Sequence, residues 1–224
     1  MDRSTGTTPG GQGRFDGYDV LGQVSTWDEV TAGVVLRRLG PPEPMRFFTP
    51  VEESVAGALF DHLLGQWDVP KVPVLAMVDQ RLTEDRTDGW HQADLPPDQR
   101  AWHLTLSLLD EDAADRHGCG LVALSRDQQA AVIQSVQDRA GEAGGRWHGL
   151  PAAHVWSLWT RYACTAFYAH PWAWNEIGFG GPAYPRGYKN VGVDKREPWE
   201  RPEHDPRDPI PGMRTAERQR GSAR

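Results

Sequence analysis

Apolar residues recur at helical spacing along much of the chain, and the clearest example begins at Thr49. Thr49 and Glu52 form a capping box, in which each side chain satisfies a free backbone amide at a helix start, with Pro50 in the first helical position. The apolar positions that follow share one helical face: Val51, Val55, Leu59, Leu63 and Leu64. The pattern predicts a helix from Pro50 to about Trp67.

Four later stretches repeat this helical period. They run from Pro73 to Leu82, Gln99 to Asp115, Ser125 to Gly141 and Ala152 to Ala169. The third stretch opens with a second capping box, and no run shows the sustained alternation of a strand. We therefore expect an all-α fold, a compact bundle of about five helices whose short loops join antiparallel neighbours.

An N-terminal extension precedes this bundle. Arg14 to Leu21 are predicted to be extended, and Thr26 with Glu29 matches a capping box for a short helix ending near Arg38. The prolines between Pro41 and Pro44 then break the helix and form a stiff linker. The extension therefore holds one short helix.

The predicted organisation has four parts. They are a flexible head (1–13), the extension (14–46), the helical domain with an irregular Gly/Pro/aromatic end (47–190) and an extended, largely disordered tail (191–224). From about Pro202 the tail has almost no apolar residues, so it cannot bury enough surface to offset its ordering entropy.

Charge and hydrophobicity narrow the range of partners. The 224 residues carry a net charge of −7 and no dense basic run before the last few residues, which argues against nucleic acid. No apolar run approaches the ~20 residues of a membrane span. The start of the chain has neither an apolar signal region nor a twin-arginine pattern. We expect a cytoplasmic protein, with export alongside a partner left open.

Catalytic and cofactor signatures are missing from the sequence. The eight histidines lack metal-ligand or haem spacing, and no nucleophile elbow is present. The glycines at 178–181 lack the preceding strand and following helix of a dinucleotide site. We expect no catalytic site, metal or cofactor in this chain. Two alternatives stay open: a metal-binding enzyme using His148, His154 or His170, and a scaffold whose partner is not a flavoprotein.

The segment 170–188 mixes rigid aromatic side chains with glycines and prolines, which is typical of a docking surface that is neither helix nor strand. Trp172, Trp174 and Trp199 have irregular surroundings and are expected at an interface. Glu176 fits either a turn carboxylate or a salt bridge to a partner arginine. The predicted partner-binding residues are His170, Pro171, Trp172, Trp174, Glu176, Gly178, Phe179, Gly181, Tyr184, Pro185, Arg186, Gly187, Tyr188 and Trp199.

Three motifs together resemble the gluconate 2-dehydrogenase subunit 3 family. They are Phe48-Thr49-Pro50-x-Glu52, the turn Leu124-Ser125-Arg126-Asp127-Gln128-Gln129, and Tyr168-Ala169-His170-Pro171-x-x-Trp174-x-Glu176-Ile177-Gly178-Phe179 continuing through Pro185-Arg186-Gly187-Tyr188. The third motif is the most specific, and the resemblance extends from about Phe47 to Tyr188.

The resemblance implies a small, helical, non-catalytic subunit. Its partner would be a large FAD-dependent dehydrogenase of the glucose-methanol-choline (GMC) type, acting on sugars, sugar acids or glycosides. The FAD belongs to that partner, and a cytochrome subunit completes some complexes. Family members often carry a twin-arginine signal and are thought to help fold and export the large subunit. This sequence shows no such signal.

Overall fold

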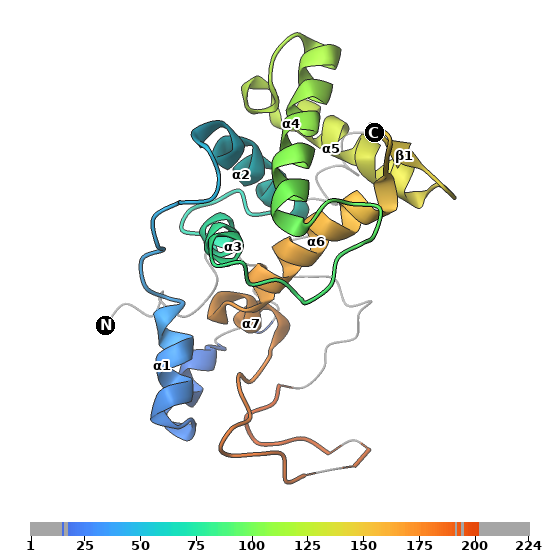
Figure 1. Cartoon of the computed structure of the whole chain (residues 1–224). Helices are drawn as coiled ribbons and strands as arrows, with labels where there is room; N and C mark the ends of the chain where they lie inside the picture. The colour runs from blue at the N-terminus through green and yellow to red at the C-terminus, as the bar shows by residue number, and fades with distance from the viewer. Residues whose placement is uncertain (1–14, 16–17, 191, 194, 202–224) are drawn as a thin grey trace, which may run out of the picture. The chain divides into compact units, whose positions relative to one another are not determined.

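The computed structural model describes residues 15, 18–190, 192, 193 and 195–201. The predicted head and most of the predicted tail lie outside these residues. The chain divides into two units, each drawn in Figure 1. Unit 1 comprises 1–41, 67–72 and 168–224, and unit 2 comprises 42–66 and 73–167. The predicted domain 47–190 is thus divided, because its last part groups with the N-terminal extension.

The predicted all-α architecture is confirmed, with α2 to α6 matching the five expected helices. Their bounds are α2 Pro50–Leu64, α3 Val74–Thr83, α4 Asp98–His117, α5 Arg126–Gly141 and α6 Ala152–Tyr168. A short 3-10 helix, η2 (Leu121–Ala123), lies between α4 and α5. The described residues add one hairpin that the sequence pattern did not predict, β1 (Arg146–Trp147) paired antiparallel with β2 (Leu150–Pro151).

The predicted capping boxes of α2 and α5 form. Thr49 with Glu52 opens α2, and Ser125 with Gln128 opens α5. Helix α2 ends before Trp67 because Gly65 adopts the left-handed conformation, with φ of 65°. That conformation is readily available to glycine and ends many helices. Glycine therefore stops α2 earlier than its apolar pattern indicates.

Aromatic side chains form the centre of unit 2. Trp102 on α4 is fully buried and lies 5.5 Å from Phe60 and 5.6 Å from Tyr162 between ring centroids. Trp159 on α6 is also fully buried, and its indole Nε1 donates to the Thr105 hydroxyl at 3.0 Å. These contacts hold α2, α4 and α6 together. The mid-helix position of Cys164, between Ala163 and Thr165, predicts a small core residue, but the structure leaves this cysteine exposed.

A buried carboxylate fastens the linker before α2. Asp79 on α3 is 1% exposed and accepts the backbone amides of Arg46, Phe47 and Phe48 at 2.8 to 2.9 Å. Three amide donors compensate for removing the carboxylate from water. The linker is therefore held against α3 by an interaction that prolines alone do not provide.

Unit 1 contains η1 (Val20–Thr26), α1 (Glu29–Arg37) and α7 (Pro171–Ile177). The prediction of an extended segment reaching Leu21 is wrong at its end, because η1 begins at Val20. Thr26 is not the cap of α1, since its hydroxyl donates to the carbonyl of Gln23. Asp28 caps α1 instead, accepting the amide of Thr31 at 2.6 Å. Its carboxylate lies directly before the helix, where an acceptor is most useful.

Within the described ranges, no helix combines the length and the apolar character required to cross a membrane.

Candidate functional site

The first part of the predicted docking segment is a helix, which corrects the expectation of an irregular backbone. His170 is the N-cap of α7, and its Nδ1 accepts the amide of Trp172 at 3.2 Å. Pro171 occupies the first helical turn, and Gly178 ends the helix with φ of 67°. Proline at the start and glycine just past the end are the usual asymmetry of a helix.

Trp174 lies in the core of unit 1. Its side chain is 5% exposed and packs in one cluster with Tyr18, Val20, Trp27 and Val35. The expectation that Trp174 lies at an interface is therefore corrected, because its ring is buried within unit 1. The N-terminal extension supplies the apolar surface that covers this ring, and such a contribution from residues so distant in sequence leaves no local signal.

Hydrogen bonds fix the extension to the segment around α7. The Val20 amide donates to Asn175 Oδ1 at 2.8 Å in a buried position, and the Tyr18 hydroxyl donates to the carbonyl of Phe179 at 3.0 Å. At the end of α1, Arg38 Nη1 donates to the carbonyl of Ala169 at 2.6 Å. The extension and the docking segment are therefore parts of one packed body.

Three glycines in the segment allow aromatic rings to approach the backbone. A Cβ atom at Gly178 would lie 2.6 Å from the Phe15 ring, and one at Gly181 would lie 2.4 Å from Trp27. A Cβ at Gly180 would lie 2.7 Å from Trp199. Real Cβ atoms do not come so close to their neighbours. Gly178 and Gly181 thus have packing roles within the chain, and their roles at a partner surface stay predictions.

Arg186 braces the second half of the segment. Its guanidinium donates to the Thr26 hydroxyl at 2.8 Å and to the carbonyl of Gly180 at 2.5 Å. It also lies 4.1 Å from the centroid of the Trp199 ring. Trp199 is half-buried in this way, and Gly187 has a positive φ of 66°.

The remaining predicted residues differ in exposure. Tyr184, Tyr188 and Phe179 expose 67%, 53% and 41% of their surface. Pro185 is also exposed, and Trp172 and Glu176 are half-buried. His170 and Pro171 are buried. The structure therefore separates an inner side, which packs within unit 1, from an outer side with three aromatic rings.

His170 is held in its neutral form. Burial lowers the pKa of its imidazole from 6.5 to about 4, against an opposing hydrogen bond to the backbone of Arg38. The positive charge of Arg38 favours the same neutral form. Neutral imidazole can accept the Trp172 amide, whereas imidazolium cannot. The N-cap of α7 therefore depends on the protonation state of His170.

This dependence predicts a loss of stability in mild acid. The pKa of His170 in the folded state lies below the 6.5 of an unfolded chain. The contribution of neutral His170 to the free energy of unfolding is therefore complete above pH 6.5 and declines as the pH falls toward 4. We expect the free energy of unfolding to fall by about 2 kcal/mol from this source between pH 7 and pH 5. Urea denaturation of wild type and His170→Asn across this range measures it, since asparagine caps helices without titrating.

The matched control for this measurement is His91→Asn, at an exposed histidine. It should keep the pH dependence of the wild type. Equal pH profiles for wild type and His170→Asn would contradict the assignment.

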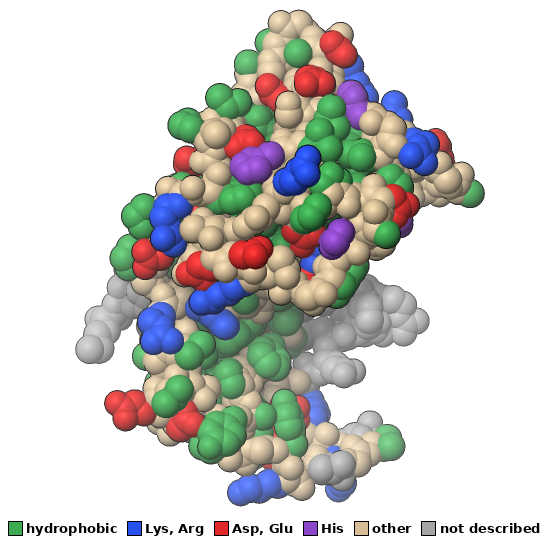
Figure 2. Space-filling model, viewed as in Figure 1, with side chains coloured by type: hydrophobic (Ala, Val, Ile, Leu, Met, Phe, Trp, Pro, Cys, Tyr) green, Lys and Arg blue, Asp and Glu red, His purple; other side chains and the backbone are tan. Residues whose placement is uncertain are grey.

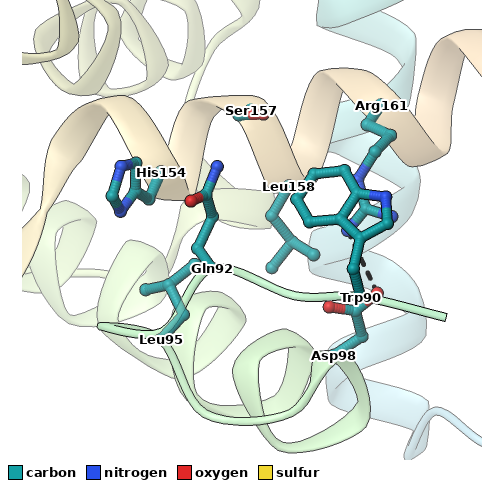
Figure 3. A pocket seen from close by; sticks show the side chains of 8 residues that line it. All are labelled: Trp90, Gln92, Leu95, Asp98, His154, Ser157, Leu158 and Arg161. Carbon is teal, nitrogen blue, oxygen red and sulfur yellow. Dashed lines mark hydrogen bonds and ion pairs between the residues drawn. The ribbon is translucent and has the colours of Figure 1, made fainter. Parts of the chain in front are cut away.

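Unit 2 holds a second candidate, a small pocket between the α3–α4 loop and α6 (Figure 3). Its volume of about 10 Å³ has room for about one water molecule. Arg161 lies beside the Trp90 ring at 4.9 Å, and its Nε has no hydrogen-bond partner. His154 Nδ1 lies 3.5 Å from Asp94, which is long for a hydrogen bond.

A charge network forms the wall of this pocket. Asp98 is 4% exposed and accepts from the Tyr162 hydroxyl at 2.7 Å and from Arg161 at 3.0 Å. Asp88 bonds both Arg161 and Arg81. Burial and the bond to Asp98 raise the pKa of Tyr162, so its hydroxyl stays protonated as a donor. The network holds α6 to α4 and to the loop after α3, and no sequence motif reveals it.

The histidines of the metal alternative have separate partners. His148 bonds Asp112 at 2.8 Å, His154 faces Asp94, and His170 caps α7. Over the part of the chain that the structure describes, no group of three His, Cys, Asp or Glu side chains is placed to hold a metal.

Fold and site together define an all-α protein whose C-terminal aromatic segment is braced by its own N-terminal residues. A family model described as gluconate 2-dehydrogenase subunit 3 matches residues 50–181, more than half of the 224. The chain belongs to this family, as its motifs predict. Comparison with curated proteins and with solved structures gives no significant match.

Proposed function

We propose that this chain is the accessory subunit of a flavin-dependent GMC-type dehydrogenase that oxidises sugars, sugar acids or glycosides. In this proposal it binds and stabilises or matures the large catalytic subunit, which carries the FAD. A cytochrome subunit fits the same complex. Membership of the subunit 3 family is the observation on which the proposal rests.

The outer side of the docking segment supports the proposal. Tyr184, Tyr188 and Phe179 are large exposed rings on a backbone that Arg186 holds in one shape. Rigid aromatic side chains lose little entropy on binding and often dominate interface energies. A subunit that presents them at its surface is suited to a stable contact with another protein.

Co-expression tests the proposal. Expressed with the flavoprotein encoded beside its own gene, the tagged chain should retain a larger yellow protein whose absorbance spectrum is that of FAD. Tyr184→Glu places a charge where an apolar contact is expected and should reduce the recovered flavoprotein about tenfold or more, as at an interface hot spot. The control is Val122→Glu, at an exposed apolar residue of unit 2.

Other outcomes point to the alternatives. A solitary, colourless chain that does not alter the yield of the flavoprotein would overturn the proposal. Stoichiometric zinc or iron in the purified chain would favour the metal enzyme. Recovery of a different, flavin-free neighbour would favour the scaffold.

A further inference from the structure

Helix α1 lies outside the family match, which begins at residue 50, and yet it is part of the same packed body as the docking segment. Its inner residue Val35 is 1% exposed in the cluster around Trp174. Arg38 at its end bonds the carbonyl of Ala169. Any protein that binds the docking segment therefore meets α1 in a fixed position within unit 1.

The outer side of α1 carries exposed apolar residues between the exposed charges of Glu29 at its start and Arg37 at its end. Val30 and Val34, one helical turn apart, are 77% and 37% exposed. Between them, a Cβ atom at Gly33 would meet no other atom within 4 Å. Figure 2 shows hydrophobic side chains at the surface over this helix. Residues at positions i and i+4 share one side of a helix, so the valines form a stripe that an apolar groove can accept.

Exposed apolar residues are concentrated in unit 1. The described residues include fifteen large hydrophobic side chains that are exposed, and only four of them belong to unit 2. The four are Val51, Trp90, Leu104 and Val122. The other eleven lie in unit 1, although unit 2 contains more of the described residues.

Net charge also differs between the two units. Unit 2 has seventeen Asp and Glu against nine Arg, a net charge of −8, and the rest of the chain has fourteen acidic and fifteen basic residues. The cores of protein interfaces are depleted in charged residues and enriched in aromatic ones. Unit 1 is not depleted in charged residues, with 29 of its 104 residues charged against 26 of 120 in unit 2. Of the six aromatic side chains that are exposed among the described residues, however, five lie in unit 1. The aromatic criterion therefore favours unit 1 as the contact surface.

We infer that the Val30–Val34 stripe of α1 is a second docking contact for the large subunit, beside the aromatic rings of the docking segment. The inference rests on the proposed function. The occupant is an apolar groove of the large subunit, because exposed apolar and aromatic side chains are concentrated in the unit that carries α1. Residues outside the family match thus contribute to selecting the partner.

Single glutamates on α1 test this contact. Val30→Glu and Val34→Glu should each weaken the affinity for the co-expressed flavoprotein about tenfold or more, measured by interferometry. Val51→Glu is the matched control, because Val51 is 66% exposed and follows the first residue of α2 as Val30 follows the first residue of α1. It should bind as the wild type does. Circular dichroism shows whether each variant keeps its helices.

A photo-crosslinking residue at position 30 provides a measurement that does not depend on stability. Placed there it should attach to the large subunit, and placed at position 51 it should not. Equal affinities for Val30→Glu, Val34→Glu and Val51→Glu, without a crosslink from position 30, would overturn the inference and leave the proposed function standing. Failure of the wild type to bind the flavoprotein overturns both.

Self-association is the remaining outcome. If the chain alone dimerises, and Val30→Glu abolishes the dimer while binding of the flavoprotein is unchanged, the stripe binds a second copy and the inference is wrong.

Discussion

Replacing Asp98 with alanine should lower the free energy of unfolding by about 3 kcal/mol, because Arg161 loses the more buried of its two carboxylate partners and the Tyr162 hydroxyl loses its acceptor. Asp98 is the acceptor for Arg161 and for the Tyr162 hydroxyl. Arg161 has only 18% of its side chain exposed, so water replaces the lost carboxylate poorly. Urea denaturation followed by far-ultraviolet circular dichroism measures the change.

Two further variants isolate the cause of that loss. Asp98 and Asp127 both lie in the first turn of a helix, α4 and α5 respectively, but Asp127 is exposed. Asp127→Ala should therefore lower the free energy of unfolding by only about 0.5 kcal/mol. Tyr162→Phe removes one of the two donors and should cost about 1 kcal/mol. If Asp98→Ala is no more destabilising than Asp127→Ala, the network does not hold α4 to α6 in solution.

Gly181→Ala should destabilise unit 1 by about 3 kcal/mol, the sum of overpacking against Trp27 and of a left-handed backbone at alanine. A Cβ atom at this position would lie 2.4 Å from the Trp27 ring, and φ is 76°. Because the ring is packed in the core, it has little freedom to move away. The destabilised core opens locally more often, so hydrogen exchange at the buried Val20 amide should accelerate.

The matched control is Gly187→Ala, at a glycine with φ of 66° and no atom within 4 Å of a Cβ. This variant places alanine in a left-handed backbone conformation without a steric clash, so its free energy of unfolding should fall by about 1 kcal/mol. The difference between the two variants measures the close packing of position 181 against Trp27 and, at 3.1 Å, against Val20. Equal losses would show that the ring does not pack against Gly181.

Local sequence signals predicted the helices of unit 2 well. Thr49 with Glu52 and Ser125 with Gln128 each bring donors and acceptors together within four residues, so the helix starts are visible in the sequence itself. The start of α7 was missed because histidine is not among the preferred N-cap residues, and its role depends on a neutral, buried ring.

The core around Trp174 and the charge network around Asp98 could not be predicted, because the residues that form each of them are distant in sequence. Val20 meets Asn175 across 155 residues, and Asp98 meets Tyr162 across 64. Hydrophobic periodicity shows that a tryptophan such as Trp174 has a preferred face but not which segment covers it. The composition of the docking segment predicted rigid aromatic surface, and the structure divides that surface between the chain's own core and its exterior.

The order of synthesis constrains when unit 1 can form. The contact between Arg38 and Ala169 spans 131 residues, so α1 leaves the ribosome on the order of ten seconds before its support exists. Helices α2 to α5 have all been synthesised in that interval, whereas the core around Trp174 is incomplete until α7 emerges. Until then the apolar residues of α1 are open to chaperones. Assembly of the docking surface is consequently a late event in translation, and the nascent chain cannot recruit a partner through it earlier.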